Sequence, residues 1–270
     1  LAGLAQDHLL GRAEYPSLSS GIDAIDSMMG PMRVGGLYTI GARTGNGKSS
    51  MCFNIAKAVC SAGGRVIFFS LEMGKHQLAD IMLKIESGVP KRARPADGDE
   101  KEVREAAARM AGWQLLIDDR SRPTLGYIQR AINRQKRIWG GVDLVVIDYI
   151  QLMATGLSVP GDPETMSIGK VTAGLKALGR ENEVVVLAPA QVNRAGTDGE
   201  RPGLTNLRGS GTIEQDSDAV LFVHNPAATE SYTRPPGGEE VEVYVGKNRH
   251  GARGLRKMRF DGPTQRFYEI

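Results

Sequence analysis

The sequence predicts an α/β fold: a mostly parallel sheet with helices on both faces and antiparallel strands at its C-terminal edge. Short apolar runs alternate with segments of helical spacing along most of the 270 residues. The central runs, such as RVIFFSL (65–71) and EVVVLAPAQ (183–191), are apolar almost throughout. This pattern is typical of parallel strands covered on both faces. The closing runs SDAVLFVHN, EVEVYVGKN and GLRKMRFDG are expected as the antiparallel strands.

The first half of the chain contains two strand–helix pairs. Residues 1–14 read as a short helical piece that ends before Pro16. The run GLYTIGA (36–42) is a short apolar strand that ends in a glycine-rich loop, and the segment 49–63 has helical spacing and stops at two glycines. The run at 65–71 has the length and β-rich content of a buried strand, and a helix is expected at about 75–87.

The second half continues this alternation. A helix at 100–112 precedes an apolar strand at 113–119, and the helical segment 124–139 precedes the apolar strand at 142–150. A further helix, at 165–182, leads into the central strand that ends at Gln191. With no internal repeat and no low-complexity segment, one domain accounts for everything after the first 14 residues.

Composition argues against several classes of protein. No run approaches 18 consecutive apolar residues, and the N-terminus lacks the layout of a signal peptide, so a cytoplasmic protein without membrane contact is expected. The net charge of +3 argues against a surface that coats nucleic acid but leaves a locally basic groove open. Cys52 and Cys60 lie about 12 Å apart on one predicted helix and are expected as reduced core residues. Because the chain begins with Leu1, it is expected to be part of a longer protein.

The stretch GARTGNGKSS (41–50) resembles the phosphate-binding loop G-x-x-x-x-G-K-[ST], with Ala42 in place of the first glycine. It lies between a predicted strand and a predicted helix, which is the context that the motif requires. Backbone N–H groups and the helix N-terminus would hold the β- and γ-phosphates, while Lys48 adds a positive charge and the Ser49 hydroxyl can ligate Mg²⁺. An ordinary strand–loop–helix joint is the alternative. The expected nucleotide-binding residues of this loop are Arg43, Thr44, Gly45, Asn46, Gly47, Lys48, Ser49 and Ser50.

Three polar residues end predicted strands and are candidates for the chemistry. Asp148 closes an apolar run on the next-but-one central strand, where an acid would orient Mg²⁺-bound water, although it could be a turn former. Glu72 is expected at the tip of the strand beside the phosphate-loop strand and is a candidate general base, with a structural or solvated acid as the alternative. Gln191 is a strand-tip residue that could sense the γ-phosphate.

Six blocks carry a resemblance to a known family: ARTGNGKSS, FFSLEMG, VVIDYIQLM, APAQVNR, LRGSGTIEQDSDAVLF and VGKNRHG. In this order and approximate spacing they resemble the C-terminal motor domain of DnaB-type (RecA-like, superfamily 4) replicative DNA helicases, bacterial or phage. The resemblance covers residues 15–270. Because members of that family commonly carry Ala at the first loop position, Ala42 indicates a working variant of the loop.

The resemblance implies a RecA-like P-loop NTPase motor that uses ATP and Mg²⁺. It implies a homo-hexameric ring with ATP at each subunit interface, which translocates on single-stranded DNA and unwinds duplex, 5′→3′. Residues 1–14 resemble the end of the linker helix that docks on the adjacent subunit. Primase and a helicase loader are implied as partners only through an N-terminal domain outside this sequence.

Individual residues take roles from the same resemblance. Glu72 matches the catalytic base, Asp148 the metal-orienting acid, and Gln191 the residue that links the phosphate to the DNA loops. Lys247 and Arg249 match the pair that reaches into the neighbouring subunit's site, with Arg249 as the arginine finger. A solvated basic turn is the alternative for this pair.

A glycine-rich segment, RPGLTNLRGSGTIEQDSD, matches the loop that lines the central channel and grips DNA phosphates. Arg208, Gly209 and Gly211 lie on the matching positions. Phosphate contacts suit a motor that must move on any sequence, because they carry no base information. The segment holds little aromatic content, so base stacking is not the expected grip. A flexible surface loop is the alternative.

Three other functions remain as rivals. A recombinase of the RecA/RadA type shares the fold and the phosphate loop but forms filaments on DNA; the blocks SLEMG and GKNRHG argue against it. A switch ATPase of the circadian-clock type would ignore DNA. A non-catalytic nucleotide-binding scaffold fits poorly with the presence of Glu72, Asp148 and Lys48 together.

Overall fold

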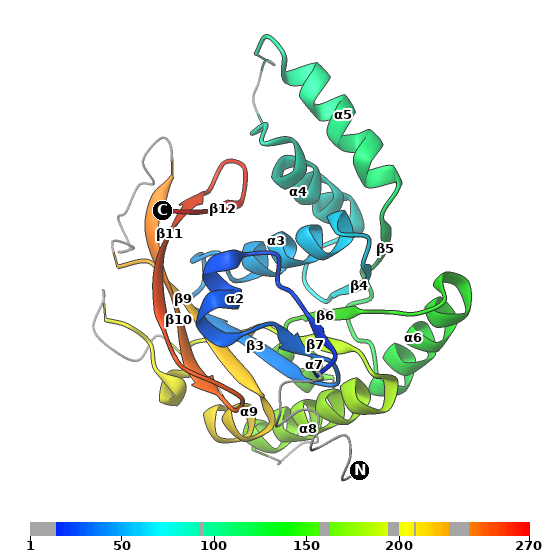
Figure 1. Ribbon diagram of the computed structural model, residues 1–270. Coiled ribbons are helices and arrows are strands. Elements are labelled where there is room, and N and C mark those ends of the chain that lie inside the picture. Colours follow the sequence, from blue (N-terminus) through cyan, green and yellow to red (C-terminus); the bar gives the residue numbers. More distant parts are fainter. Residues whose placement is uncertain are drawn as a thin grey trace.

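The fold is a central sheet between two layers of helices (Figure 1). The computed structural model describes residues 15–91, 94, 96–156, 163–193, 200–207, 209–226 and 238–270. The helix expected at 1–14 and the predicted DNA-binding Arg208 therefore lie outside the described residues.

Most strands lie close to the predicted ranges, although the short strands at 17–18 and 32–33 and the last strand at 266–269 were not predicted. The strands are β1 (Ser17–Leu18), β2 (Met32–Arg33), β3 (Leu37–Ala42), β4 (Arg65–Ser70), β5 (Gln114–Asp118), β6 (Leu144–Asp148), β7 (Val185–Leu187), β8 (Ala190–Gln191), β9 (Ala219–His224), β10 (Glu239–Asn248), β11 (Leu255–Asp261) and β12 (Arg266–Glu269).

The helices of the described residues include the five predicted after residue 14, in the predicted order, and three that were not predicted, at 23–29, 150–155 and 210–216. The helices are α2 (Asp23–Met29), α3 (Lys48–Ser61), α4 (Lys75–Ser87), α5 (Asp99–Ala111), α6 (Leu125–Trp139), α7 (Ile150–Thr155), α8 (Glu164–Asn182) and α9 (Ser210–Asp216), with a 3₁₀ turn, η1, at Leu204–Asn206.

Within the described residues, the main sheet has ten strands in the order β12-β11-β10-β9-β3-β7-β6-β4-β5, with β8 also paired to β3. All pairs from β9 to β5 are parallel. Strands β10, β11 and β12 continue the sheet in antiparallel order. The predicted parallel centre with an antiparallel C-terminal edge is confirmed.

Two apolar cores lie on the two faces of this sheet. Helices α2, α3 and α4 cover one face, and α6, α7, α8 and α9 cover the other. Along β4, Val66 and Phe68 point into the first core, whereas Ile67 and Phe69 point into the second. A strand buried on both faces must be apolar at every position, which explains the continuous runs in the sequence.

Two details of the sequence prediction are wrong. The strand before Glu72, β4, was expected beside β3, but β7 and β6 lie between them. Strands that come later in the chain fill these two positions, and local sequence does not encode that order. The glycine-rich segment 201–218 is not a loop throughout, because it contains η1 and the helix α9.

The two cysteines lie in the first core, on α3. Both are free and buried. Burial raises the pKa of the Cys60 thiol to about 12 and that of the Cys52 thiol well above its usual value. The expectation of reduced core residues is confirmed. Among the described helices, none has the length and apolar character needed to cross a bilayer.

Replacing Phe68 by Ala is expected to lower the free energy of unfolding by about 3–5 kcal/mol. Phe68 is 1% exposed, and its ring stacks on Phe53 with 4.7 Å between the centroids. Denaturant titration would measure the loss. Ile138→Ala serves as the control, because Ile138 is 60% exposed and its truncation should cost less than about 0.5 kcal/mol. Equal losses in the two variants would contradict this placement of the core.

Candidate nucleotide-binding site

A cavity of about 420 Å³ lies where β3, β4, β6 and β8 end. Ligands bind at this carboxyl edge in open α/β sheets. The cavity brings together most of the predicted nucleotide residues, including Glu72 and Gln191, although Asn46 is buried beside it and not part of the lining. The lining residues are Ala42, Arg43, Thr44, Gly45, Gly47, Lys48, Ser49, Ser50, Phe53, Glu72, Met73, Ile81, Tyr149, Gln191, Phe260 and Gln265.

The phosphate loop joins β3 to α3 through a glycine that no other residue replaces easily. Gly47 caps α3 with φ of +86°, and a Cβ added there would lie 3.0 Å from the ring of Phe267. Both the conformation and the space therefore favour glycine. Because α3 begins at Lys48, its positive end faces the cavity. Within the loop, the N–H of Asn46 donates to the carbonyl of Arg43 at 3.1 Å. The prediction that this N–H is directed to the cavity is therefore wrong.

Lys48 and Asp148 meet below the loop. The Lys48 Nζ lies 3.4 Å from Asp148 Oδ1 and 3.7 Å from the centre of the Tyr149 ring. The Asp148 side chain is 1% exposed, which makes a partner for each carboxylate oxygen important. Its Oδ2 nevertheless has no hydrogen-bond partner among the described residues.

A magnesium ion fits this arrangement. Mg²⁺ prefers oxygen donors and keeps several waters, binding proteins through one or two side chains plus substrate phosphates. The unpartnered Asp148 Oδ2 and the Ser49 hydroxyl on the cavity wall supply such donors. In the described part of the chain no cluster of three or more His, Cys, Asp or Glu side chains could hold a metal alone, so the phosphates would complete the site.

Glu72 reaches the same cavity from the end of β4. Its side chain is exposed, and no described residue hydrogen-bonds or ion-pairs with its carboxylate. A carboxylate that is not engaged in the fold can accept a proton from a water molecule.

Gln191 connects the phosphate loop with the segment that precedes α9. Its Nε2 donates to Thr44 Oγ1 at 3.1 Å. The next residue, Val192, forms an isolated bridge with Leu207, and Asn193 N donates to Asn206 O at 2.8 Å. The strand-tip position predicted for Gln191 is confirmed. The contacts of residues 191–193 lead from the cavity to the segment just before Gly209.

The hairpin of β11 and β12 closes one side of the cavity and was not predicted. Gln265 lines the cavity with φ of +60° and accepts a hydrogen bond from the Ser50 hydroxyl through Oε1. Asn54 Nδ2 donates to the Gln265 carbonyl at 2.8 Å. The only signal in the sequence is the turn DGPT, which indicates a hairpin but not its place over α3.

The comparisons with known proteins agree with this geometry. A family model described as the DnaB-like helicase C terminal domain matches residues 17–269. The chain belongs to the DnaB-like helicase C-terminal domain family.

Curated relatives of this family member include three proteins named replicative DNA helicase DnaB. The chain is 32% identical to that of Leifsonia xyli subsp. xyli over 258 residues, 32% identical to that of Pasteurella multocida over 267, and 33% identical to that of Mycoplasma genitalium over 269. These matches cover 93–95% of this chain but 55–57% of the relatives. The chain therefore spans little more than half the length of the curated relatives it matches.

Two solved structures have a similar fold. A structure described as a DnaB-like replicative helicase and its interactions with primase superposes with a TM-score of 0.87 and 26% identity, covering 99% of this chain and 67% of that one. A second structure, described as an ATPase domain, superposes with a TM-score of 0.86 and 24% identity, covering 100% of this chain and 97% of that one. The second likeness concerns the fold alone.

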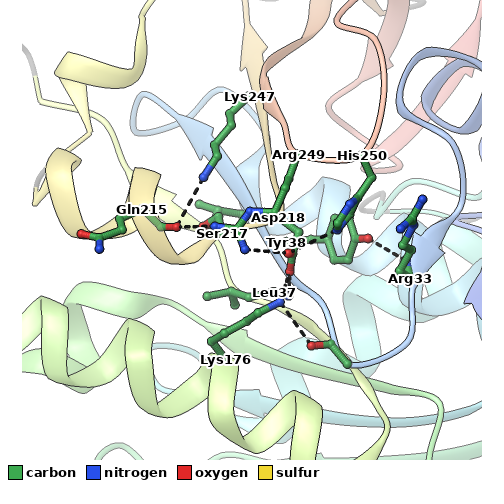
Figure 2. A network of polar contacts seen from close by, with 12 residues as sticks. Arg33, Leu37, Tyr38, Lys176, Gln215, Ser217, Asp218, Lys247, Arg249 and His250 are labelled. Atoms are coloured by element: carbon green, nitrogen blue, oxygen red, sulfur yellow. Dashed lines mark hydrogen bonds and ion pairs between the residues drawn. The ribbon is translucent and has the colours of Figure 1, made fainter. Parts of the chain in front are cut away.

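In this DnaB-like domain, Lys247 and Arg249 lie at the opposite edge of the sheet from the cavity. Figure 2 shows the two side chains with their neighbours Gln215 and Asp218. Asn248 pairs with Ala219, which also pairs with Tyr38 near the start of β3, whereas the phosphate loop follows the end of β3. Four residues of strand, about 13 Å, separate the two edges. The structure does not bring this pair to the cavity of its own chain.

Burial and neighbouring cations shift the pKa values of the titratable groups around this pair. Burial and the Arg249 charge lower the pKa of the Lys247 ammonium. Burial and the Arg33 charge lower the pKa of the His250 imidazole from its usual value. Besides Lys247 and Arg249, the described residues of this edge include Arg33, Lys176 and Arg180, which line a cavity together with Arg249.

Gly209 and Gly211 lie at the start of α9. Gly209 has φ of +83°, and a Cβ added there would lie 2.7 Å from Ile168 on α8, whereas Gly211 has open space around it. Glycine at position 209 is thus explained by the fold, whereas a Cβ at Gly211 would meet no heavy atom within 4 Å. The DNA-binding role of this segment stays a prediction.

Proposed function

We propose that this chain is the motor of an ATP-dependent replicative DNA helicase. Copies of the chain would form a hexameric ring, by analogy with the family, that hydrolyses ATP between subunits, translocates on single-stranded DNA and unwinds duplex 5′→3′. The observation that carries this proposal is the separation of two half-sites on one chain: the cavity with Lys48 and Glu72 at one sheet edge, and Lys247 with Arg249 at the other. The names of the curated relatives support it.

Each half-site has a role in the proposed reaction. The phosphates of ATP would lie against Lys48 and the N-terminus of α3. A magnesium ion held by Ser49 and Asp148 would neutralise phosphate charge. Glu72 would accept the proton of the attacking water, and Gln191 would transmit the state of the phosphate to the segment beyond it.

The neighbouring subunit completes the site in this proposal. Its Arg249 and Lys247 would stabilise the charge that develops on the transferred phosphoryl group. The segment with Arg208, Gly209 and Gly211 would contact DNA phosphates in the ring channel. Residues 15–270 would form this motor, residues 1–14 would be the end of a linker helix, and primase or a loader would bind outside this chain.

The proposal is tested by ATP hydrolysis measured across protein concentration, with and without single-stranded DNA. A rate per subunit that climbs steeply with concentration and rises further with DNA is expected, because each site needs two copies. A flat rate that ignores DNA would contradict it. The recombinase alternative is not favoured by the family match, and electron micrographs distinguish it by filaments instead of closed rings.

A further inference from the structure

Asp218 is a buried carboxylate at the amino edge of the sheet, between α9 and β9 (Figure 2). It is 3% exposed. Its Oδ2 accepts hydrogen bonds from Leu37 N at 2.8 Å and from Lys176 Nζ. Its Oδ1 lies 3.3 Å from Arg249 Nη1 and 3.5 Å from His250 Nε2. Among the described residues, Lys176 and Arg249 are the lysine and arginine side chains that form ion pairs with this carboxylate.

The two cations of the proposed trans half-site are also bound to the last turn of α9. Arg249 Nη2 donates to the Gln215 carbonyl at 2.9 Å, and its backbone N donates to the Asp218 carbonyl at 2.7 Å. Lys247 Nζ donates to the carbonyl of Glu214 and lies 3.4 Å from that of Gln215. Both side chains are therefore engaged by acceptors of their own chain.

We propose that Asp218 is a positioning residue that stores Arg249 on its own subunit until DNA binding releases it. This inference rests on the proposed function. A guanidinium that donates to Asp218 and Gln215 cannot at the same time present the same N–H groups to the neighbour's phosphate. The stored contacts thus compete with the catalytic contact, and Asp218 lowers the rate when no DNA is bound.

Helix α9 supplies the connection to DNA. It begins directly after Gly209 and contains Gly211 in its first turn, and its last carbonyls hold Lys247 and Arg249. Seven residues of helix span about 10 Å without an internal joint. A DNA phosphate that shifts the start of α9 therefore also shifts the carbonyls that hold the two cations.

Removing Lys176 is expected to change the DNA-free rate of ATP hydrolysis in the opposite direction to removing the Asp218 carboxylate. Lys176 lies on α8 and donates to the same carboxylate, so its removal leaves Arg249 as the main counter-charge of Asp218. Arg249 is then held more tightly. A merely structural role predicts the same direction for both substitutions, because each breaks one buried ion pair.

The experiment compares Asp218→Asn and Lys176→Met in the full chain, at a protein concentration that saturates the wild-type rate. Without DNA, D218N is expected to raise kcat for ATP hydrolysis about fivefold or more, and K176M to lower it by a similar factor, with KM for ATP unchanged. With single-stranded DNA both variants should approach the wild-type rate. Glu240→Gln and Lys257→Met, which break an exposed ion pair of 2.6 Å, serve as matched controls and should leave both rates unchanged.

Equal losses in both variants, with and without DNA, would overturn the inference. If D218N does not fold, K176M decides alone: a lowered DNA-free rate with a normal DNA-stimulated rate supports storage, and any other result overturns it. A wild-type rate that ignores DNA would instead overturn the proposed function and the inference together. If DNA stimulates ATP hydrolysis by the wild type, and D218N and K176M hydrolyse ATP at the wild-type rates, only the inference is overturned.

Discussion

Replacing Arg249 by Ala is expected to lower ATP hydrolysis by about 10³- to 10⁵-fold while ATP binding is retained. Arg249 lies at the amino edge of the sheet, so its loss leaves the cavity of its own chain intact. In the proposed ring, it would remove a charge from the site of the next copy. Single-turnover hydrolysis and equilibrium binding of a fluorescent ATP analogue would measure the two quantities separately.

A mixing experiment separates action in trans from damage within one chain. Lys48→Ala copies keep Arg249, and Arg249→Ala copies keep Lys48, so each variant alone is expected to be inactive. Their mixture should recover activity at interfaces where the two intact halves meet. Arg253→Ala is the control, because Arg253 is an exposed arginine of the following turn. Full activity of R249A, or no recovery in mixtures that assemble, would remove the trans assignment.

Replacing Glu72 by Gln is expected to lower kcat for ATP hydrolysis by about 10²- to 10⁴-fold. Gln keeps the shape and the exposure of the side chain but cannot take the proton of the attacking water. KM should change little, because no described residue depends on this carboxylate for a contact. Steady-state kinetics over a range of ATP concentrations would show the split.

Asp119→Asn is the matched control for Glu72. Asp119 also follows a strand at the carboxyl edge, but its Oδ2 accepts a hydrogen bond from Lys75 N at 3.0 Å at the start of α4, and it does not line the cavity. This backbone hydrogen bond also lowers the pKa of its carboxyl group. D119N should leave kcat within about twofold of wild type. If D119N lowered kcat as much as E72Q, the effect of E72Q would reflect damage to the fold and not the loss of a general base.

The parts of the site that the sequence predicts are those with local signals. Lys48 follows from a loop motif between a strand and a helix, and Asp148 from its place at the end of an apolar run. Both depend on neighbours within a few residues. Their 3.4 Å contact in the structure follows once two parallel strands end at the same edge.

The parts that sequence reasoning missed depend on contacts between distant segments. The strand of Glu72 was misplaced because strand order depends on which later strands enter the sheet. The helix α9 begins in a glycine-rich stretch and is held by α8, where Thr172 Oγ1 donates to Asp216. The Asp218 cluster gathers partners from β3, α8 and the turn after β10, so no single stretch of sequence announces it.

In the proposed assembly, the two half-sites at opposite sheet edges would also give the ring of subunits a direction. When one copy inserts its cations into the cavity of the next, its own cavity and the other copy's cations stay open, so the contact is heterologous and does not saturate in a two-fold dimer. A chain of copies joined in this way grows until the rotation between successive copies closes it into a ring. Every contact between neighbouring copies then points the same way around the ring. An assembly with this vectorial order has two distinct rims, and it can therefore distinguish the two ends of a strand that threads it.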